Sequence, residues 1–419
     1  MRPAIGIDFG TTNSVVAMRR ADGSLRTLRH ATDDVFRSVL CFWRDGPGPA
    51  RHAAGPAAIE AHLADPIDSR LIMSMKSYLA QQSFTETRVF GRTHTLEALV
   101  GLFLGALLEP FRDDLDGAGV TVGRPVRFVG QGQDEGLGER RLRAGFAAAG
   151  LGAVRVALEP AAAGHRFARG LDAAAVVLVA DFGGGTSDFS VLRFDRGSPR
   201  RVVALGHAGV GIAGDAFDAR IIDRVVAPCL GKGTGYSVMG GEMLPVPPAW
   251  FTSFARWNRL SMMRAPRMLR DIAEVARTAE HPERLHWLIR LVEEEAGYAL
   301  YRAVSGVKAA LSVADCAVLD FRHGGFALAE EIDRAAFEGW IAPDLARIAG
   351  AVDAALADAA IAPAAVDRVF LTGGTSFVPA VRRIFEDRFG AARIDAGGEF
   401  VSVAEGLALM DAEADARAA

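Results

Sequence analysis

The sequence has 419 residues, a hydrophobic content of 50% and a formal net charge of −4 at pH 7. A chain of this length is too long for one simple core, so two lobes are expected from size alone. The basic residues are interspersed with acidic ones and form no sustained stripe, which gives no reason to expect a nucleic-acid partner. The longest apolar helix candidate, Leu96–Phe111, contains Glu97 and Glu109 and is too short to span a bilayer, so no membrane partner is expected.

The chain opens with a strand, a turn and a second strand. The turn sequence is Asp8-Phe9-Gly10-Thr11-Thr12, between two apolar runs. Further strands are expected at Ser24–Arg29 and Phe36–Trp43, and a helical pattern runs from Ala53 to Leu79. Lys76 lies near the end of that pattern, where a lone lysine is usually solvated.

Helices and strands then alternate. Helices are expected at Leu96–Leu115 and Glu139–Ala149, and strands at Arg124–Gly130 and Val154–Ala157. The last strand delivers Glu159, which precedes a proline at a strand-to-helix junction. Such a carboxylate either orients a water or supplies a charge that the helix N-terminus favours.

The middle of the chain repeats the opening pattern. A buried strand, Ala173–Ala180, leads through Asp181 and three consecutive glycines, 183–185, into a strand that carries Thr186 and Asp188. Consecutive glycines let backbone N–H groups converge on phosphate oxygens, and an adjacent aspartate can hold Mg²⁺ through its water shell. The alternative is a plain β-hairpin with a glycine turn. Because the unit occurs twice, roughly 170 residues apart, we expect a duplicated two-lobed fold in which both hairpins clamp a triphosphate.

The second half is mostly helical. Asp215 and Asp218 stand where a helix over 219–226 would begin, and either could cap it. A loop rich in glycine and proline, 229–248, precedes a helical block over 249–311. The remaining expected elements are a strand at Val366–Leu371, helices at Pro379–Phe389 and Val401–Met410, and a disordered tail over 411–419.

Cysteine usage and the start of the chain indicate a compartment. Cys41, Cys229 and Cys316 are odd in number and far apart, which favours reduced thiols over a disulfide framework. The first strand starts almost at Met1 and leaves no room for a signal peptide. A cytoplasmic location is therefore expected.

Five segments in order carry a family resemblance. The two hairpins, the run Glu159-Pro160-Ala161-Ala162-Ala163-Gly164, the turn Gly214-Asp215-Ala216-Phe217-Asp218 and the loop 370–379 (FLTGGTSFVP) resemble the DnaK-like seventy-kilodalton heat-shock family of the actin-like ATPase superfamily. The likeness covers nearly the whole chain and is strongest to the short YegD-type members.

This resemblance implies an α/β fold with two lobes, each a ribonuclease-H-like domain with an inserted subdomain. The first lobe would be 1–180, with its core at 1–33 and 119–180 and its insertion at 34–118. The second lobe would be 181–410, with its core at 181–228 and 312–410 and a mainly helical insertion at 229–311. The tail would be 411–419.

The resemblance also implies an ATP/ADP site with Mg²⁺. Asp8 and Asp181 would hold the hydrated metal, Thr186 would contact the terminal phosphate, and Lys76, Glu159 and Asp188 would position the attacking water. The other expected nucleotide contacts are Gly10, Thr11, Thr12, Gly183, Gly184, Gly185, Gly214, Lys308, Ser312, Gly373, Gly374, Thr375 and Phe377.

The adenine pocket departs from the family pattern. Lys308 and Ser312 match it, but Ser305 replaces the ribose-contacting glutamate. Ala309 and Phe377 replace two arginines whose planes would sandwich a purine. Each lost stacking or cation–π contact is worth on the order of 1 kcal/mol, so phosphate recognition carries over better than adenine recognition. Phe377 could stack on the base instead.

The first hypothesis is an ATP-binding, chaperone-like protein that hydrolyses ATP slowly and closes its lobes on the nucleotide, acting on an unknown client or co-chaperone. It would lack the peptide-binding domain of DnaK. The second hypothesis is a nucleotide-gated binding module, or pseudo-ATPase, with a degenerate adenine pocket. A sugar kinase is disfavoured, because Lys76 and Glu159 match the water-hydrolysing branch, and filament formation as in actin relatives stays open.

Overall fold

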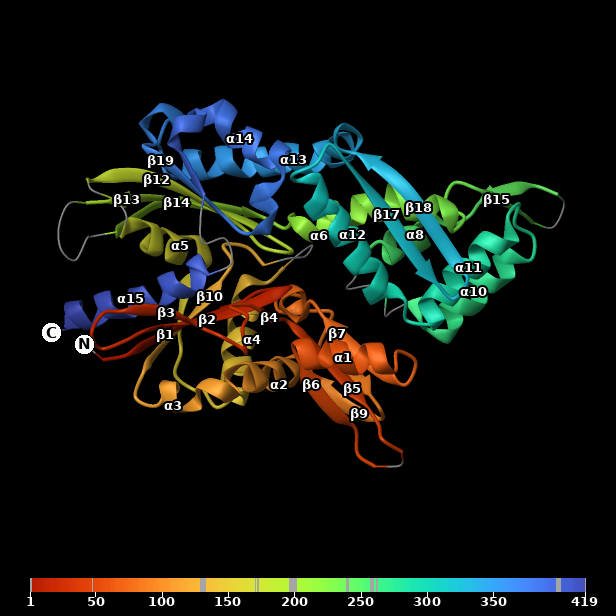
Figure 1. Ribbon diagram of the computed structural model, residues 1–419, viewed down its shortest axis with the longest axis horizontal. Helices are drawn as coiled ribbons and strands as arrows, with labels where there is room; N and C mark the ends of the chain where they lie inside the picture. The colour runs from red at the N-terminus through yellow and green to blue at the C-terminus, as the bar shows by residue number, and fades with distance from the viewer. Residues whose placement is uncertain are drawn as a thin grey trace. The chain divides into compact units, whose positions relative to one another are not determined.

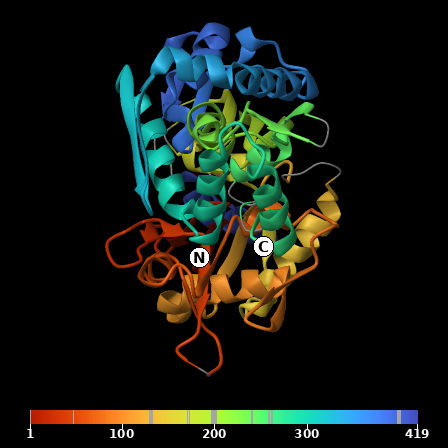
Figure 2. The same cartoon turned by 90° about the vertical axis from the view of Figure 1, so that its right-hand side faces the viewer.

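The computed structural model describes residues 2–46, 48–128, 133–169, 171, 173–195, 202–238, 241–256, 260, 263–396 and 401–418. The chain forms two compact units (Figures 1 and 2). Unit 1 comprises residues 1–64, 69–214 and 345–419, and unit 2 comprises residues 65–68 and 215–344. The lobe boundaries implied by the resemblance stay a prediction, and both large sheets belong to unit 1.

Unit 1 contains two large sheets with the same topology. In the first, β1 (Ala4–Phe9) is antiparallel to β2 (Asn13–Arg19) and parallel to β10 (Gly119–Arg124). Here β3 (Leu25–Leu28) and β11 (Arg155–Leu158) are the outer strands, and β4 (Phe36–Arg37) adds a short pairing to β2.

The second sheet repeats this order. β12 (Ala175–Phe182) is antiparallel to β13 (Ser187–Phe194) and parallel to β19 (Arg368–Thr372). Its outer strands are β14 (Val202–Val210) and β20 (Ile394–Ala396). The structure therefore confirms the α/β fold of two equivalent halves that the repeated hairpin predicted.

Helices follow the strands in a matching order. α2 (Leu96–Leu108), α4 (Glu135–Ala148) and α5 (Glu159–Ala168) belong to the first half, and α13 (Arg334–Asp358), α14 (Pro379–Phe389) and α15 (Ser402–Ala418) to the second. α5 packs on β12 and β13, α15 packs on β1 and β2, and the two helices contact each other (Figure 1).

Glycines make this helix contact close. A Cβ atom on Gly406 of α15 would lie 1.7 Å from the carbonyl oxygen of Ala162 on α5, and a Cβ atom on Gly6 of β1 would lie 2.0 Å from the carbonyl oxygen of Ala404. α15 is thus held between β1 and α5 with no room for side chains at these points.

The insertion of unit 1 is a small α/β layer. The sheet order is β6 (Arg51–Ala54), β5 (Val39–Trp43), β7 (Ser69–Met73), with α1 (Pro56–Ala64) beside it. A hairpin, β8 (Glu86–Val89) and β9 (Arg92–Thr95), follows. Short turns of helix, η1 (Met75–Tyr78), η2 (Glu109–Phe111) and α3 (Arg112–Leu115), complete it.

Unit 2 is helical with two hairpins. Its helices are α6 (Gly214–Ile221), η3 (Ile222–Val226), α7 (Ala227–Cys229), α8 (Pro248–Phe254), α10 (Pro266–Ala276), α11 (Pro282–Glu293) and α12 (Gly297–Leu311). The hairpins are β15 (Gly235–Ser237) with β16 (Met243–Pro245), and β17 (Cys316–His323) with β18 (Phe326–Asp333). Figure 2 shows the long β17–β18 hairpin beside α12.

Several element predictions were wrong. The helix expected over 53–79 is only α1, because Pro66 cannot continue a helix and Ser69–Met73 pairs with β5 instead. The strand expected at Arg124–Gly130 ends at Arg124, since Pro125 has no N–H for a ladder; Val129 and Gly130 lie outside the described residues.

Two further differences lie in the second half. The β17–β18 hairpin was not anticipated. α15 continues to Ala418 through the segment expected to be a disordered tail, and the alanines there suit a helix.

Within the described residues, no helix is long and apolar enough to cross a membrane. Cys41 is buried, Cys229 is half-buried and Cys316 is exposed, and all three are free thiols.

Candidate functional site

Each of the two equivalent hairpins carries an aspartate next to the end of its first strand. Asp8 is paired with Val15 across β1 and β2, and Asp181 is paired with Asp188 across β12 and β13. Both aspartates are half-buried. Each therefore lies one residue before the end of its strand, next to the turn that follows.

The first turn requires glycine. A Cβ atom on Gly10 would lie 2.0 Å from the carbonyl oxygen of Asn13. The turn is also fixed from outside, because the carbonyl of Thr12 accepts a hydrogen bond of 2.9 Å from the backbone N–H of Ser38. Thr11 is buried beside it.

The second turn is closed by its own backbone. The N–H of Gly183 donates to the carbonyl of Thr186 at 2.9 Å. Gly184 and Gly185 lie between them, and the Thr186 side chain hydrogen-bonds Asp188. The backbone N–H groups of such a turn are a suitable lining for phosphate oxygens.

Lys76 and Glu159 form a buried ion pair. Lys76 Nζ lies 2.6 Å from Glu159 Oε1, and the two side chains are 8% and 6% exposed. Lys76 lies in η1, whose preceding residue Ser74 has φ of 57°. Glu159 is the first residue of α5. The lysine is therefore not on a solvated helix face. Glu159 has the helix N-terminal position that one of its two interpretations predicted, and its role toward a water stays a prediction.

Asp188 is fixed by backbone donors. Its Oδ1 accepts hydrogen bonds from the N–H groups of Val126, at 2.8 Å, and Arg127, at 3.3 Å. A Cβ atom on Gly209 of the neighbouring strand would lie 2.5 Å from that oxygen, so glycine is needed there.

These groups interact electrostatically. Burial raises the pKa of Asp8 to about 7, and repulsion by Glu159 adds to the effect. Burial also raises the pKa of Asp188 to about 7 and that of Asp181 well above its usual range. Burial lowers the pKa of Lys76, but Glu159, Asp8 and Asp181 more than offset this, so the net shift is upward.

This donor set fits a hydrated divalent cation. One ammonium group, that of Lys76, faces four carboxylates, which belong to Asp8, Glu159, Asp181 and Asp188. The carboxylates repel one another, and a bound cation would offset this repulsion. The described residues contain no cluster of three or more His, Cys, Asp or Glu side chains able to ligate a metal directly. Mg²⁺ held through its waters is compatible with both observations.

The third loop lies against the second hairpin. Gly373 has φ of 86°, and a Cβ atom there would lie 2.0 Å from the carbonyl oxygen of Phe182. Gly374 begins a short 3₁₀ turn that ends at Phe377. Thr375 is buried, whereas Phe377 is 50% exposed. The loop thus presents an aromatic side chain next to the strand that carries Asp181.

The remaining expected residues belong to unit 2 or its border. Gly214 begins α6. Lys308 Nζ pairs with Asp218 Oδ1 at 2.9 Å, and the Ser312 hydroxyl donates to the carbonyl of Lys308 at 3.2 Å. Asp218 is fully buried, so it is an ion-pair partner of Lys308 rather than a surface cap. Burial raises the pKa of Asp218, and Lys308 opposes the shift.

Sequence reasoning missed the groups that support this site. Arg124 and the N–H groups of Val126 and Arg127 lie in a segment expected to be strand, and Arg141 on α4 binds the carbonyls that follow η1. An arginine next to a proline was the only available signal for the first group.

The family is shown by comparison with known proteins. The model of the Hsp70 protein family matches residues 141–233 and 292–410, which is just over half of the chain. The chaperone protein DnaK of Thermotoga petrophila is 28% identical over 392 residues, covering 92% of this chain and 55% of the relative.

Two further relatives give similar values. An HscA homologue of Tolumonas auensis is 27% identical over 97% of this chain and 57% of its own length. DnaK of Thermus thermophilus is 27% identical over 93% of this chain and 57% of its own length. The chain thus spans about half the length of these curated relatives. On the family match, this chain belongs to the Hsp70 family.

Proposed function

We propose that the chain binds Mg-ATP and Mg-ADP, with unit 1 holding the phosphates and the metal, and hydrolyses ATP slowly. The observation that carries this proposal is the convergence of Asp8, Asp181, Asp188 and Glu159 on Lys76, beside two equivalent turns. Four carboxylates face one ammonium group, so when they are deprotonated they have too few cations to pair with. Perturbed carboxylates of this kind gather at functional sites.

The turns and the aspartates have separate roles. The backbone N–H groups of Gly10–Thr12, Gly184 and Gly185 would bind phosphate oxygens, while the N–H of Gly183 holds the turn closed on Thr186. Asp8 and Asp181 would accept hydrogen bonds from the waters of the metal. Bound Mg²⁺ neutralises phosphate charge and that of the two aspartates. In the nucleotide complex the Thr186 hydroxyl would turn from Asp188, which it hydrogen-bonds in the free chain, and donate to the terminal phosphate.

Water activation falls to the buried ion pair and Asp188. Lys76 donates to the terminal phosphate and to the attacking water, while Glu159 holds the lysine in place at 2.6 Å. Asp188 accepts a proton of that water through Oδ2, since its Oδ1 already accepts hydrogen bonds from two N–H groups. Hydrolysis here rests on positioning and charge stabilisation.

Adenine would be recognised by stacking on Phe377, whose exposed ring follows the Gly373–Gly374 turn. In this proposal Lys308 and Ser312 are further nucleotide contacts, and the two lobes close on the bound nucleotide. Both of these statements depend on the family resemblance alone. The relatives are named chaperones. A chaperone-like role, an unidentified client or co-chaperone, a cytoplasmic location and kinship with the YegD-type members are part of the proposal.

A single-turnover ATPase assay tests it. Lys76→Met should lower the hydrolysis rate on the order of 10²-fold, because the water and the terminal phosphate lose a positioned donor. Lys232→Met is the matched control, since Lys232 pairs with Asp223 at 2.7 Å in unit 2. Binding of Mg-ATP without turnover in the native chain would favour the nucleotide-gated binding module, for which the Ala309 and Phe377 replacements are the supporting observation.

A further inference from the structure

The segment between β10 and α4 connects a surface network to Asp188. Its first four residues are Pro125, Val126, Arg127 and Phe128, here called the segment 125–128, and they belong to no strand. The N–H groups of Val126 and Arg127 donate to Asp188 Oδ1 at 2.8 and 3.3 Å. The N–H of Phe128 donates to Glu135 Oε1 at 3.2 Å. The N–H groups of Val126, Arg127 and Phe128 therefore all donate to carboxylates.

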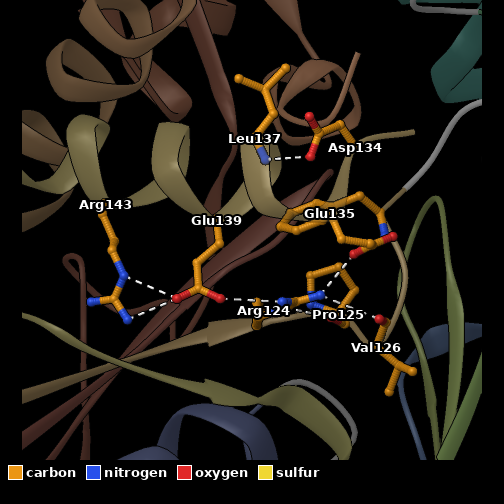
Figure 3. A network of polar contacts seen from close by, with 9 residues as sticks. Arg124, Pro125, Val126, Asp134, Glu135, Leu137, Glu139 and Arg143 are labelled. Atoms are coloured by element: carbon orange, nitrogen blue, oxygen red, sulfur yellow. Dashed lines mark hydrogen bonds and ion pairs between the residues drawn. The ribbon is translucent and has the colours of Figure 1, made fainter. Parts of the chain in front are cut away.

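Arg124 binds the opposite side of the same segment (Figure 3). Its Nε donates to the carbonyl of Pro125 at 3.1 Å, and its Nη2 donates to that of Val126 at 3.4 Å. The guanidinium also stacks on the Phe128 ring, 5.2 Å from the centroid. The side chain is 17% exposed, so these contacts are largely shielded from water.

Two glutamates of α4 fix the guanidinium. Arg124 Nη2 lies 2.7 Å from Glu135 Oε2, and Nη1 lies 3.2 Å from Glu139 Oε2. The helix that carries them is capped by Asp134, whose Oδ1 accepts from the Leu137 N–H at 2.9 Å. Glu139 is also bound by Arg143 at 2.9 Å (Figure 3). Arg124 is thus anchored to a capped helix.

Peptide planarity turns these contacts into a positioning device. The carbonyl of Pro125 and the N–H of Val126 belong to one rigid peptide plane and point in opposite directions. The same holds for the carbonyl of Val126 and the N–H of Arg127. A guanidinium that holds both carbonyls therefore orients both N–H groups toward Asp188.

We propose that Arg124 is a positioning residue for Asp188, which it acts on through the first two peptide planes of the segment 125–128. The Oδ1 atom of Asp188 has little further freedom, because Gly209 also lies against it with no space for a Cβ atom. The direction of the remaining carboxylate oxygen is then set by the segment that Arg124 holds. The consequence for hydrolysis rests on the proposed function; the structural coupling does not.

Amide hydrogen exchange in the nucleotide-free protein tests the coupling. Arg124→Met should accelerate exchange of the Val126 and Arg127 amides roughly tenfold, the scale of one lost hydrogen bond to a charged group. Asp188→Ala should have a similar effect, and the double variant should exchange no faster than either single variant. Arg143→Met is the control, because Arg143 binds Glu139 and contacts no residue of the segment in any described interaction.

Arg124→Lys distinguishes the loss of these contacts from a folding defect in Arg124→Met. Lysine keeps the charge beside Glu135 and Glu139 but is a single ammonium without the planar fork, so exchange should be intermediate. Unchanged exchange in the Arg124 variants, or effects of Arg124→Met and Asp188→Ala that multiply in the double variant, would overturn the proposal.

Kinetics separate this proposal from the proposed function. Arg124→Met should lower the single-turnover rate roughly tenfold with an unchanged Kd for Mg-ADP, since a misplaced Asp188 affects the water and not the phosphates. If Arg124→Met lowered the affinity for Mg-ADP by the same factor as the single-turnover rate, Arg124 would not act by positioning Asp188. Coupled exchange in a native chain without ATPase activity would refute slow hydrolysis and support the positioning role.

Discussion

The contact between α5 and α15 predicts the effect of one added methyl group. Gly406→Ala would place a Cβ atom 1.7 Å from the carbonyl oxygen of Ala162, whereas non-bonded carbon contacts are about 3.5 Å. The helices would have to separate by roughly 1.8 Å to reach that distance. α15 has no free space on its other side, because Gly6 of β1 lies directly against Ala404.

Overpacking of this kind costs about 1–3 kcal/mol, and the confinement of α15 puts the cost at the upper end. The gain of alanine over glycine in a helix offsets less than about 1 kcal/mol of it. We therefore expect Gly406→Ala to reduce the free energy of unfolding by about 2 kcal/mol. It should also lower ATPase activity, because α5 begins at Glu159 and any shift of the helix stretches the 2.6 Å contact with Lys76.

Urea denaturation checks the magnitude. Gly105→Ala in α2 is the matched control, since no atom lies within 4 Å of the position of its Cβ, and it should stabilise the chain by about 0.5–1 kcal/mol. If Gly406→Ala shifts the urea midpoint in the same direction as Gly105→Ala, the inferred close contact is wrong.

Three further predictions concern the site. Lys76→Met should destabilise the chain by about 3–5 kcal/mol because it leaves Glu159 buried without its cation, and Lys76→Met with Glu159→Gln should recover most stability in urea denaturation but no turnover. Asp8→Asn should stabilise the nucleotide-free chain by about 1 kcal/mol or more at pH 8, less at pH 5. The reason is that a pKa raised to about 7 gives the folded state an extra proton that is lost as pH rises through 7; a pH-independent difference in melting temperature would contradict this. Arg141→Lys should accelerate amide exchange over 75–84, because the buried guanidinium of Arg141 donates to the carbonyls of Tyr78, Leu79, Gln81 and Phe84 and lysine cannot span them; unchanged exchange would refute this role.

The repeated hairpin was the most informative feature of the sequence. Asp8 and Asp181 stand at the same position of two similar motifs, and strand order in both sheets follows from that duplication. Buried strands and their turns leave local patterns of apolar residues and glycines in the sequence, and the α/β fold could therefore be predicted from it.

Other parts depend on long-range contacts. Ser69–Met73 is a strand because β5 offers it a partner, and no local pattern marks that choice. The support of Asp188 by the segment after Arg124 joins residues 62 positions apart through backbone N–H groups, which have no sequence signature. Only the family resemblance placed Lys76 and Glu159, 83 positions apart, in one site, and their ion pair was not anticipated.

Titration calorimetry with Mg-ADP tests the central claim most directly. The native chain should bind Mg-ADP, and Asp181→Asn should weaken the affinity about 10–100-fold, the usual effect of removing a group that holds a metal through its waters. Asp223→Asn in unit 2, which removes the partner of Lys232, should leave the affinity unchanged. Equal affinities of the native and Asp181→Asn chains, or no binding by the native chain at millimolar nucleotide, would contradict the proposed nucleotide site.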